Sequence, residues 1–257
     1  MDDNAIDTTE LEKWVREAGQ IALSYFNHGV AVHRKADRSL VTEADEEIES
    51  FLTARLRVAY PEHSIIGEEG GRAGSGQYLW AIDPLDGTRA FIHGMPVWGV
   101  SIGLLKEGRP VLGVFYMPYL DEYYYAGPQG EAFLNGHPLH CPLMERWDNN
   151  SAICVPSNVH RRYVIKFPGI IRSLGSLAAH IVYVARGTVV WSLLGRPRIW
   201  DLAGALAILE RAGGEIRYLS GRPVDLRPLL DGSRAPEPIV AAHPALIERV
   251  RALISFK

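Results

Sequence analysis

Four acidic residues stand where apolar segments begin or end, which is a pattern typical of a cation site. Asp83 follows the apolar run 79–82, and Asp86 comes three residues after it. Glu68 follows another short apolar run and precedes a glycine-rich loop, and Asp201 opens an apolar helical segment. Mg²⁺ is held by a few carboxylate oxygens and keeps several of its waters. If the fold brings these four carboxylates together, they predict a magnesium site.

The segment that follows Asp83 adds groups suited to a phosphate. Asp83 and Asp86 can share one cation across the proline-containing turn, while Leu85 offers a backbone carbonyl. Gly87 and Thr88 are predicted to begin a helix, whose free N–H groups can hold a phosphate that glycine allows to approach closely. Cations that bridge a phosphoryl group stabilise its in-line displacement by water. The segment therefore indicates phosphate-ester chemistry.

Each of these residues also has an ordinary structural explanation. Asp201 before a helix is commonly a cap, and Glu68 can belong to a solvated loop. Residues 83–88 alone can be a turn, and Thr42 with Asp45 first suggests helix capping. The functional interpretation depends on all of them occurring in one chain.

The composition is that of an ordinary soluble globular protein. The chain has 257 residues, 47% of them hydrophobic and 22% charged, with a net charge of -3. This charge gives no reason to expect nucleic acid or a membrane as a partner. The polar N-terminus does not resemble a secretory signal, and Cys141 and Cys154 form no disulfide-like pattern. These features predict a cytoplasmic protein whose two cysteines are reduced.

Apolar periodicity predicts the elements that must position the site. Helices are expected at 9–27, with a Thr9–Glu12 capping box and a stop at Gly29, and at 42–59. The expected strands of a largely antiparallel sheet are 65–66, 78–82, 98–105, 111–117 and 122–125. The second half predicts strands at 151–155, 189–193, 215–219 and 238–242, and helices at 176–185, 200–212 and 244–254. This alternation indicates a layered α/β (α+β) architecture.

Several motifs then resemble those of the inositol monophosphatase family. The two diagnostic motifs are matched by Gly67-Glu68-Glu69 with residues 80–88 (Trp-Ala-Ile-Asp-Pro-Leu-Asp-Gly-Thr), and by Trp200-Asp201-Leu202-Ala203-Gly204. Further matches are Lys35-Ala36-Asp37 with residues 41–45 (Val-Thr-Glu-Ala-Asp), residues 172–176 (Arg-Ser-Leu-Gly-Ser) and residues 240–244 (Val-Ala-Ala-His-Pro). The similarity runs over nearly the whole chain. It implies one domain over residues 1–257, with a metal-binding half at about 1–145 and an α/β half at about 146–257.

The resemblance implies a fold, a cofactor and site residues. The fold is the layered αβαβα sandwich of inositol monophosphatases and fructose-1,6-bisphosphatases; the protein would be a lithium-sensitive homodimer that hydrolyses a small phosphorylated metabolite by using two or three Mg²⁺ ions. Metal ligands would be Glu68, Asp83, the Leu85 carbonyl, Asp86 and Asp201. Glu68 and Thr88 would orient the attacking water, with Asp45 hydrogen-bonded to Thr88. Substrate would contact Asp86, Gly87, Thr88, Gly175, Ser176 and Asp201. No histidine occupies either diagnostic motif, so His93 is expected to be structural.

Departures from the family pattern concern the substrate. Arg89 and Ala90 follow Gly-Thr, as in the histidinol-phosphate phosphatases of the same family, although Arg89 can simply face solvent. Leu194 takes the place, seven residues before Asp201, of a glutamate that grips sugar-like hydroxyls, and leucine cannot accept their hydrogen bonds.

Two arginines beyond that position, Arg196 and Arg198, would favour a substrate with a second anionic group, or they are solvated on a turn. Inositol monophosphate is therefore the default substrate. Histidinol phosphate, fructose 1,6-bisphosphate and 3′-phosphoadenosine 5′-phosphate are the alternatives, and a non-catalytic binding protein on the same fold is the alternative of another class.

Overall fold

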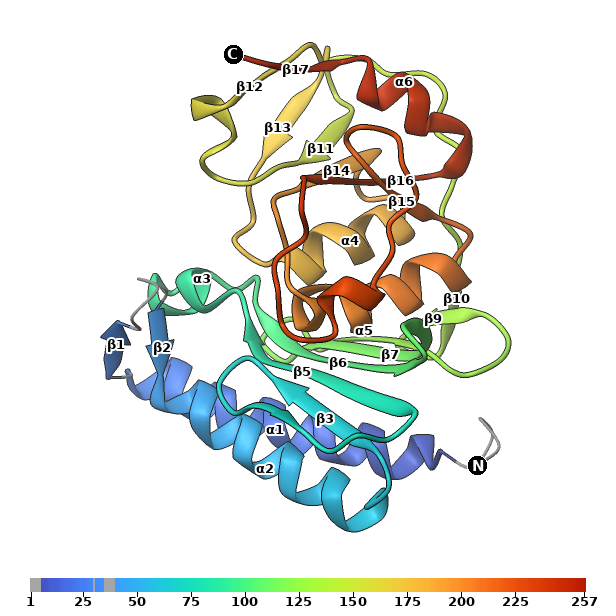
Figure 1. The fold of residues 1–257 in the computed structure, drawn as a ribbon. Helices are drawn as coiled ribbons and strands as arrows, with labels where there is room; N and C mark the ends of the chain where they lie inside the picture. Colours follow the sequence, from blue (N-terminus) through green and yellow to red (C-terminus); the bar gives the residue numbers. More distant parts are fainter. Residues whose placement is uncertain (1–5, 30, 35–39) are drawn as a thin grey trace.

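The protein is built from five alternating helical and sheet layers, as the computed structural model shows for residues 6–29, 31–34 and 40–257 (Figure 1). Lys35-Ala36-Asp37 lies outside these described residues. Helices α1 and α2 cover one face of a large sheet, and α4 and α5 lie between that sheet and a smaller one. Helix α6 covers the outer face of the smaller sheet. Three apolar cores join the layers: one between α1, α2 and the large sheet, one around α4 and α5 that reaches both sheets, and one between the smaller sheet and α6. The predicted αβαβα fold is confirmed.

The outer helices begin and end close to their predicted positions. Helix α1 spans Thr8–His28 and stops at Gly29, as expected. Its cap is Asp7, whose carboxylate accepts the backbone N–H groups of Thr9 and Glu10 at 3.0 Å. The predicted Thr9–Glu12 capping box is therefore wrong, because Asp7 already satisfies these first free donors. Helix α2 spans Glu43–Ala59 and is capped at Thr42, as predicted.

Within the described residues, eight strands form the large sheet in the order β10-β9-β8-β7-β6-β5-β3-β4. Their bounds are β3 Ser64–Gly67, β4 Gly71–Ala73, β5 Tyr78–Asp86, β6 Gly99–Lys106, β7 Arg109–Met117, β8 Glu122–Ala126, β9 Ala132–Leu134 and β10 His137–Leu139. Every neighbouring pair is antiparallel except β3 and β5. The expected antiparallel sheet is confirmed.

Strand β5 is longer than its apolar run predicts. It was expected to end at Ile82, but its pairing with β6 continues through Asp83 and Asp86, with an irregularity between them. Pro84 lies in this irregularity and has no N–H to donate to a sheet. The two carboxylates therefore lie on a bulged strand end, where polar side chains interrupt the apolar pattern before the pairing itself stops.

Five strands form the smaller sheet within the described chain, in the order β13-β11-β14-β16-β15. Their bounds are β11 Ala152–Cys154, β13 Ile170–Arg172, β14 Trp191–Leu194, β15 Glu215–Tyr218 and β16 Ile239–Ala242. Helices α4 (Leu177–Ala185) and α5 (Ile199–Arg211) confirm the predicted central pair. Helix α5 packs tightly on the large sheet because Gly204 has no side chain; a Cβ atom there would lie 2.7 Å from Ser101 Oγ.

The predicted C-terminal helix at 244–254 is wrong in its last part. A 3₁₀ turn at Pro244–Leu246 leads into the short helix α6 (Ile247–Arg251). The chain then forms β17 (Ile254–Phe256), which pairs with β12 (Tyr163–Ile165). Tertiary pairing with a distant segment overrides the local helical pattern there.

Short strands and isolated features complete the structure. Strands β1 (Val32–Arg34) and β2 (Leu40–Thr42) pair with each other, and a 3₁₀ turn covers Arg227–Leu229. Cys141 and Cys154 are buried and free, as expected. No helix within the described ranges is long and apolar enough to cross a membrane.

Candidate active site

The structure gathers the four predicted carboxylates where β5 meets α5. Asp83 is buried, and its pKa is raised well above the usual range, first by burial and then by the charges of Glu68, Asp86 and Asp201. Burial also raises the pKa of Asp201 to about 7, with further contributions from Glu68 and Asp86. Burial and the neighbouring charges disfavour the ionised forms of Asp83, Asp86 and Asp201, so a cation that binds beside these carboxylates is favoured.

Asp86 joins the two halves of the chain. Its carboxylate accepts a hydrogen bond from the Ser176 hydroxyl. It also accepts hydrogen bonds from the backbone N–H groups of Leu177, at 3.0 Å, and Ala178, at 2.9 Å. It therefore caps α4 from the end of β5, and anions are favoured at a helix N-terminus. Burial raises the pKa of Asp86 to about 6, although these hydrogen bonds act in the opposite direction. The same contacts bring Ser176 to the carboxylate cluster.

Gly87 lies where only glycine fits. Its φ of 99° is left-handed, and a Cβ atom would lie 3.1 Å from the Ser176 side chain. Helix α3 (Thr88–Ile92) starts at the next residue, as predicted. A Cβ atom on Gly175 would in turn lie 2.9 Å from Ala90. The two predicted substrate segments, 87–88 and 175–176, therefore lie side by side.

Asp45 serves both as a helix cap and as a neighbour of Thr88. One of its oxygens accepts the Thr42 backbone N–H at 2.7 Å and the Thr42 hydroxyl at 2.6 Å. The other lies 3.4 Å from the Thr88 hydroxyl, which also donates to the Leu85 carbonyl at 3.1 Å. The predicted helix cap and the predicted Asp45–Thr88 contact are therefore both present.

Glu49 supports the Glu68 loop and was missed in the sequence. Its buried carboxylate accepts the backbone N–H groups of Glu69, at 2.8 Å, and Gly70, at 2.5 Å. A Cβ atom on Gly67 would lie 2.3 Å from that carboxyl group, so the loop depends on glycine there. A signal existed, because positions 45, 49, 52 and 56 share one face of α2 and so place Glu49 on its buried side.

Asp201 occupies the third position of α5 instead of preceding the helix. Its carboxylate accepts the Arg198 backbone N–H at 2.6 Å. The alternative explanation of Asp201 as an N-cap is therefore wrong in position, although its side chain does close the first turn of α5. The pKa of Asp201 is lowered by the Arg198 backbone N–H and by the charge of Arg234, which only partly offset the effect of burial.

Arg196 and Arg198 hold a loop against the site. Arg196 Nε donates to the Ala235 carbonyl at 2.7 Å, and Arg198 donates to the Gly232 carbonyl. Ala235 N donates to the Pro197 carbonyl at 2.8 Å. Both guanidinium groups therefore hold the loop through its backbone carbonyls. Their predicted contact with substrate stays a prediction.

Arg234 is the exposed cation of this loop, and no motif in the sequence pointed to it. Its guanidinium donates to the Arg196 carbonyl at 3.4 Å, and its charge acts on Asp201. More than thirty residues separate Arg234 from Asp201 in the chain, so only the fold brings them together. Leu194 is buried in the central core and does not line the site, whereas Arg89 and His93 are exposed on α3 and its end.

Comparison with known proteins settles the family. Residues 4–255 match the model of the inositol monophosphatase family. The chain belongs to this family. It is 33% identical to a histidinol-phosphatase of Chlorobaculum parvum, covering 90% of this chain and 89% of that one. It is 30% identical to a fructose-1,6-bisphosphatase/inositol-1-monophosphatase of Aquifex aeolicus, covering 79% and 81%.

The fold agrees with that of solved family members. The IMPase of Thermotoga maritima superposes with a TM-score of 0.84 at 27% identity, over 96% of each chain. Inositol monophosphatase relatives are phosphoric monoester hydrolases, and the family is generally metal-dependent. The protein is therefore a phosphatase of this family.

The donor set of this inositol monophosphatase family member fits a hard divalent cation. All four side chains are carboxylates, and the buried ones have raised pKa values that a cation would lower. Across residues 6–29, 31–34 and 40–257, no three acidic, histidine or cysteine side chains already converge closely enough to hold an ion. Each carboxylate that accepts a backbone N–H still has further lone pairs for a metal.

Proposed function

We propose that the protein hydrolyses a small phosphate monoester with two or three Mg²⁺ ions. The observation that carries this proposal is the buried carboxylate cluster beside the segments 87–88 and 175–176. Glu68, Asp83, Asp86, Asp201 and the Leu85 carbonyl would hold the metal. When bound, Mg²⁺ supplies positive charge to the phosphoryl oxygens and lowers the pKa of water.

The chain's own groups would position the reactants. Glu68 would accept a proton from the attacking water, and Thr88 would orient that water through its hydroxyl. Asp45 and the Leu85 carbonyl already fix the Thr88 side chain. The backbone N–H groups of Gly87 and Thr88 would hold the phosphate, because Gly87 is the N-cap of α3 and Thr88 is its first residue, and such N–H groups have no partner within the helix.

Phosphate release from four substrates tests this proposal. We expect Mg²⁺-dependent turnover of at least one among inositol monophosphate, histidinol phosphate, fructose 1,6-bisphosphate and 3′-phosphoadenosine 5′-phosphate. Activity should disappear in EDTA and return with added Mg²⁺, and Li⁺ should inhibit it. If none of the four is hydrolysed with Mg²⁺, the non-catalytic alternative gains and this proposal is wrong.

The charge of the site wall favours a substrate with a second anionic group. Arg234 is exposed beside Asp201, and the turn between β14 and α5 carries two arginines and no carboxylate. These positive charges repel the ammonium group of histidinol phosphate. The same residues provide no carboxylate that could accept hydrogen bonds from the hydroxyls of inositol. Among the candidates, fructose 1,6-bisphosphate and 3′-phosphoadenosine 5′-phosphate fit it best, whereas inositol monophosphate remains the default that family membership gives.

Replacing Arg234 with glutamine should separate these substrates. We expect kcat/KM for fructose 1,6-bisphosphate to fall about tenfold, the loss typical of one charged hydrogen-bond partner. Inositol monophosphate has no second anion and should change by less than about twofold. Arg146→Gln, an exposed arginine outside the site, is the matched control. Equal losses on both substrates would contradict a role for Arg234 in selectivity.

A further inference from the structure

A buried hydroxyl group in β6 has no hydrogen-bond partner. Ser101 is fully buried, and its Oγ atom makes no hydrogen bond with any residue that the structure describes. Such a group costs free energy, because the hydroxyl has given up its hydrogen bonds to water and gained none in return. Native folds rarely keep a group of this kind, which indicates a role for it.

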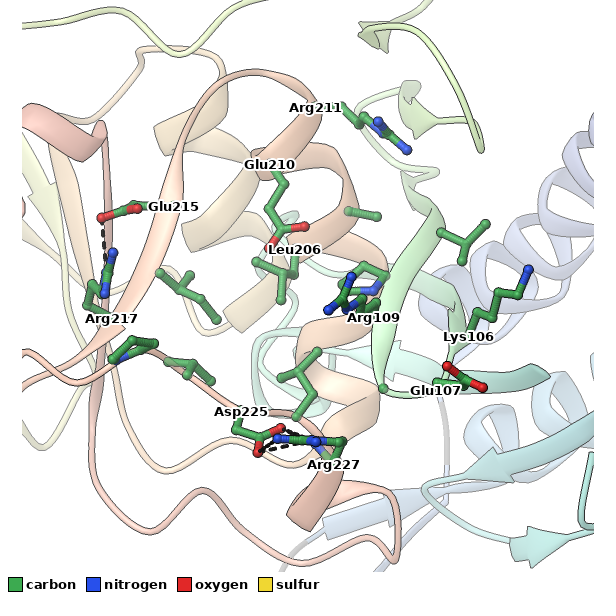
Figure 2. Close-up of a pocket in the computed structure, with 18 of the residues that line it drawn as sticks. Lys106, Glu107, Arg109, Leu206, Glu210, Arg211, Glu215, Arg217, Asp225 and Arg227 are labelled. Carbon is green, nitrogen blue, oxygen red and sulfur yellow. Dashed lines mark hydrogen bonds and ion pairs between the residues drawn. The ribbon is translucent and has the colours of Figure 1, made fainter. Parts of the chain in front are cut away.

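Exposed polar groups near the same helix raise no such question. The cleft at the C-terminal end of α5 is lined by charged side chains, and two ion pairs, Arg217–Glu215 and Arg227–Asp225, form within it (Figure 2). The other charged groups of its lining are exposed or partly exposed, so water can satisfy them. Water has no comparable access to Ser101.

Helix α5 encloses Ser101 because glycine lets the helix lie directly on β6 and β7. A Cβ atom on Gly204 would lie 2.7 Å from Ser101 Oγ, and a Cβ atom on Gly113 would lie 2.0 Å from the Gly204 carbonyl oxygen. This close packing means that a partner for the hydroxyl has to come from the protein groups around it.

The carboxylate of Asp83 is the acceptor beside Ser101. The two residues lie directly opposite each other on the antiparallel strands β5 and β6, so their side chains are on the same face of the sheet. Cβ atoms in such a pair are about 5 Å apart, which a hydroxyl and a carboxylate can span by rotation about χ1. Asp201 lies one helical turn before Gly204, so Ser101 adjoins the strand and the helix that carry two of the four carboxylates.

Asp83 has the capacity for this hydrogen bond. One of its oxygens accepts the Leu85 backbone N–H at 3.1 Å. An ionised carboxylate offers about four lone-pair sites, which are enough for that N–H group, a serine hydroxyl and a cation. Hydrogen bonds to a ligating carboxylate hold it in the orientation that the metal requires.

We infer that Ser101 is a positioning residue for the metal site, whose hydroxyl donates to the Asp83 carboxylate and orients it toward the cation. This inference rests on the proposed function, which makes Asp83 a metal ligand. Ser101 itself is not a ligand, so its replacement weakens metal binding without removing a carboxylate.

Titration of the full chain with Mg²⁺, followed by calorimetry and by the rise in unfolding temperature, tests this inference. We expect Ser101→Ala to raise the Kd for Mg²⁺ about tenfold or more, the usual cost of losing a hydrogen bond to a ligating group. Ser101→Cys keeps the size of the side chain but has only a weak donor, so it should also weaken binding. In EDTA, Ser101→Ala should unfold at the parent's temperature or above it, because it removes a buried hydroxyl that has no partner.

Ser192→Ala is the matched control. Ser192 is equally buried, in β14, but its hydroxyl donates to the His180 carbonyl at 2.8 Å. This variant should unfold at a lower temperature and bind Mg²⁺ as tightly as the parent. The inference is overturned if Ser101→Ala keeps the parent's Mg²⁺ affinity while the parent binds Mg²⁺. A parent protein that binds no Mg²⁺ would overturn the proposed function and this inference with it.

Discussion

Asp83→Asn is expected to lower kcat/KM by about three orders of magnitude or more while leaving the protein folded. Asp83 is a buried member of the cluster, and the charges of Glu68, Asp86 and Asp201 act on it. Asparagine has nearly the same shape and its oxygen can still accept the Leu85 N–H, which Asp83 accepts at 3.1 Å. It carries no negative charge, so it binds Mg²⁺ poorly, and loss of electrostatic stabilisation at such a centre costs several kcal/mol in the transition state.

The measurement is phosphate release by purified protein at saturating Mg²⁺, beside an unfolding curve. Asp148→Asn is the matched control, because Asp148 is exposed and belongs to none of the segments that form the cluster. An Asp83→Asn enzyme with the full rate would show that this carboxylate is no metal ligand. A variant that loses activity and structure together would be replaced by Asp86→Asn, which tests the same charge in a group held by three hydrogen bonds.

The increase in the free energy of unfolding that Mg²⁺ causes is expected to become larger as pH rises from about 4 to about 7. The folded-state pKa values of Asp86 and Asp201 are about 6 and about 7, against 3.8 without these surroundings. A raised carboxyl pKa means that the folded state holds protons the unfolded state has released, so stability falls as pH rises through this window. A shift of two pKa units corresponds to about 3 kcal/mol. Mg²⁺ removes this loss because it favours the charged form.

Urea unfolding in EDTA and in Mg²⁺, from pH 4 to pH 8, measures this difference. His180 must be separated from it, since burial lowers its pKa to about 4 and its contribution has the opposite sign. His180 accepts the Leu174 N–H and is not one of the proposed metal ligands. Its contribution to stability should therefore be the same in EDTA and in Mg²⁺ and cancel in the comparison. In EDTA, Asp201→Asn should be more stable than the parent by about 4 kcal/mol at pH 8, because its pKa is raised by about three units, and the gap should close near pH 4. A gap that is the same at every pH would contradict the raised pKa values.

Several properties implied by the family resemblance stay predictions. These are the homodimer, the lithium sensitivity, the cytoplasmic location and the division of the single domain at about residue 145. Size-exclusion chromatography with light scattering would measure the first of them directly.

The sequence alone determined the family, the layered fold and the four carboxylates. Long helices and strands can be predicted because burying one face requires apolar residues at a regular spacing along the sequence. Helices α1, α2, α4 and α5 all lie where that spacing predicted them. The motifs identified Asp83, Asp86 and Asp201 for a similar reason, since acidic residues interrupt apolar segments at those points. Two predictions were wrong: Asp7 caps α1 in place of the expected capping box, and strand β17 replaces the end of the expected last helix. At both places the prediction depended on only a few residues.

Only the tertiary structure decided what surrounds those carboxylates. It made Asp86 a cap for a helix ninety residues away, and it used Arg196 and Arg198 to hold the loop that presents Arg234. Charge interactions act through space and have no period along a chain, so the partners of a charged side chain are known only once the fold has brought distant segments together.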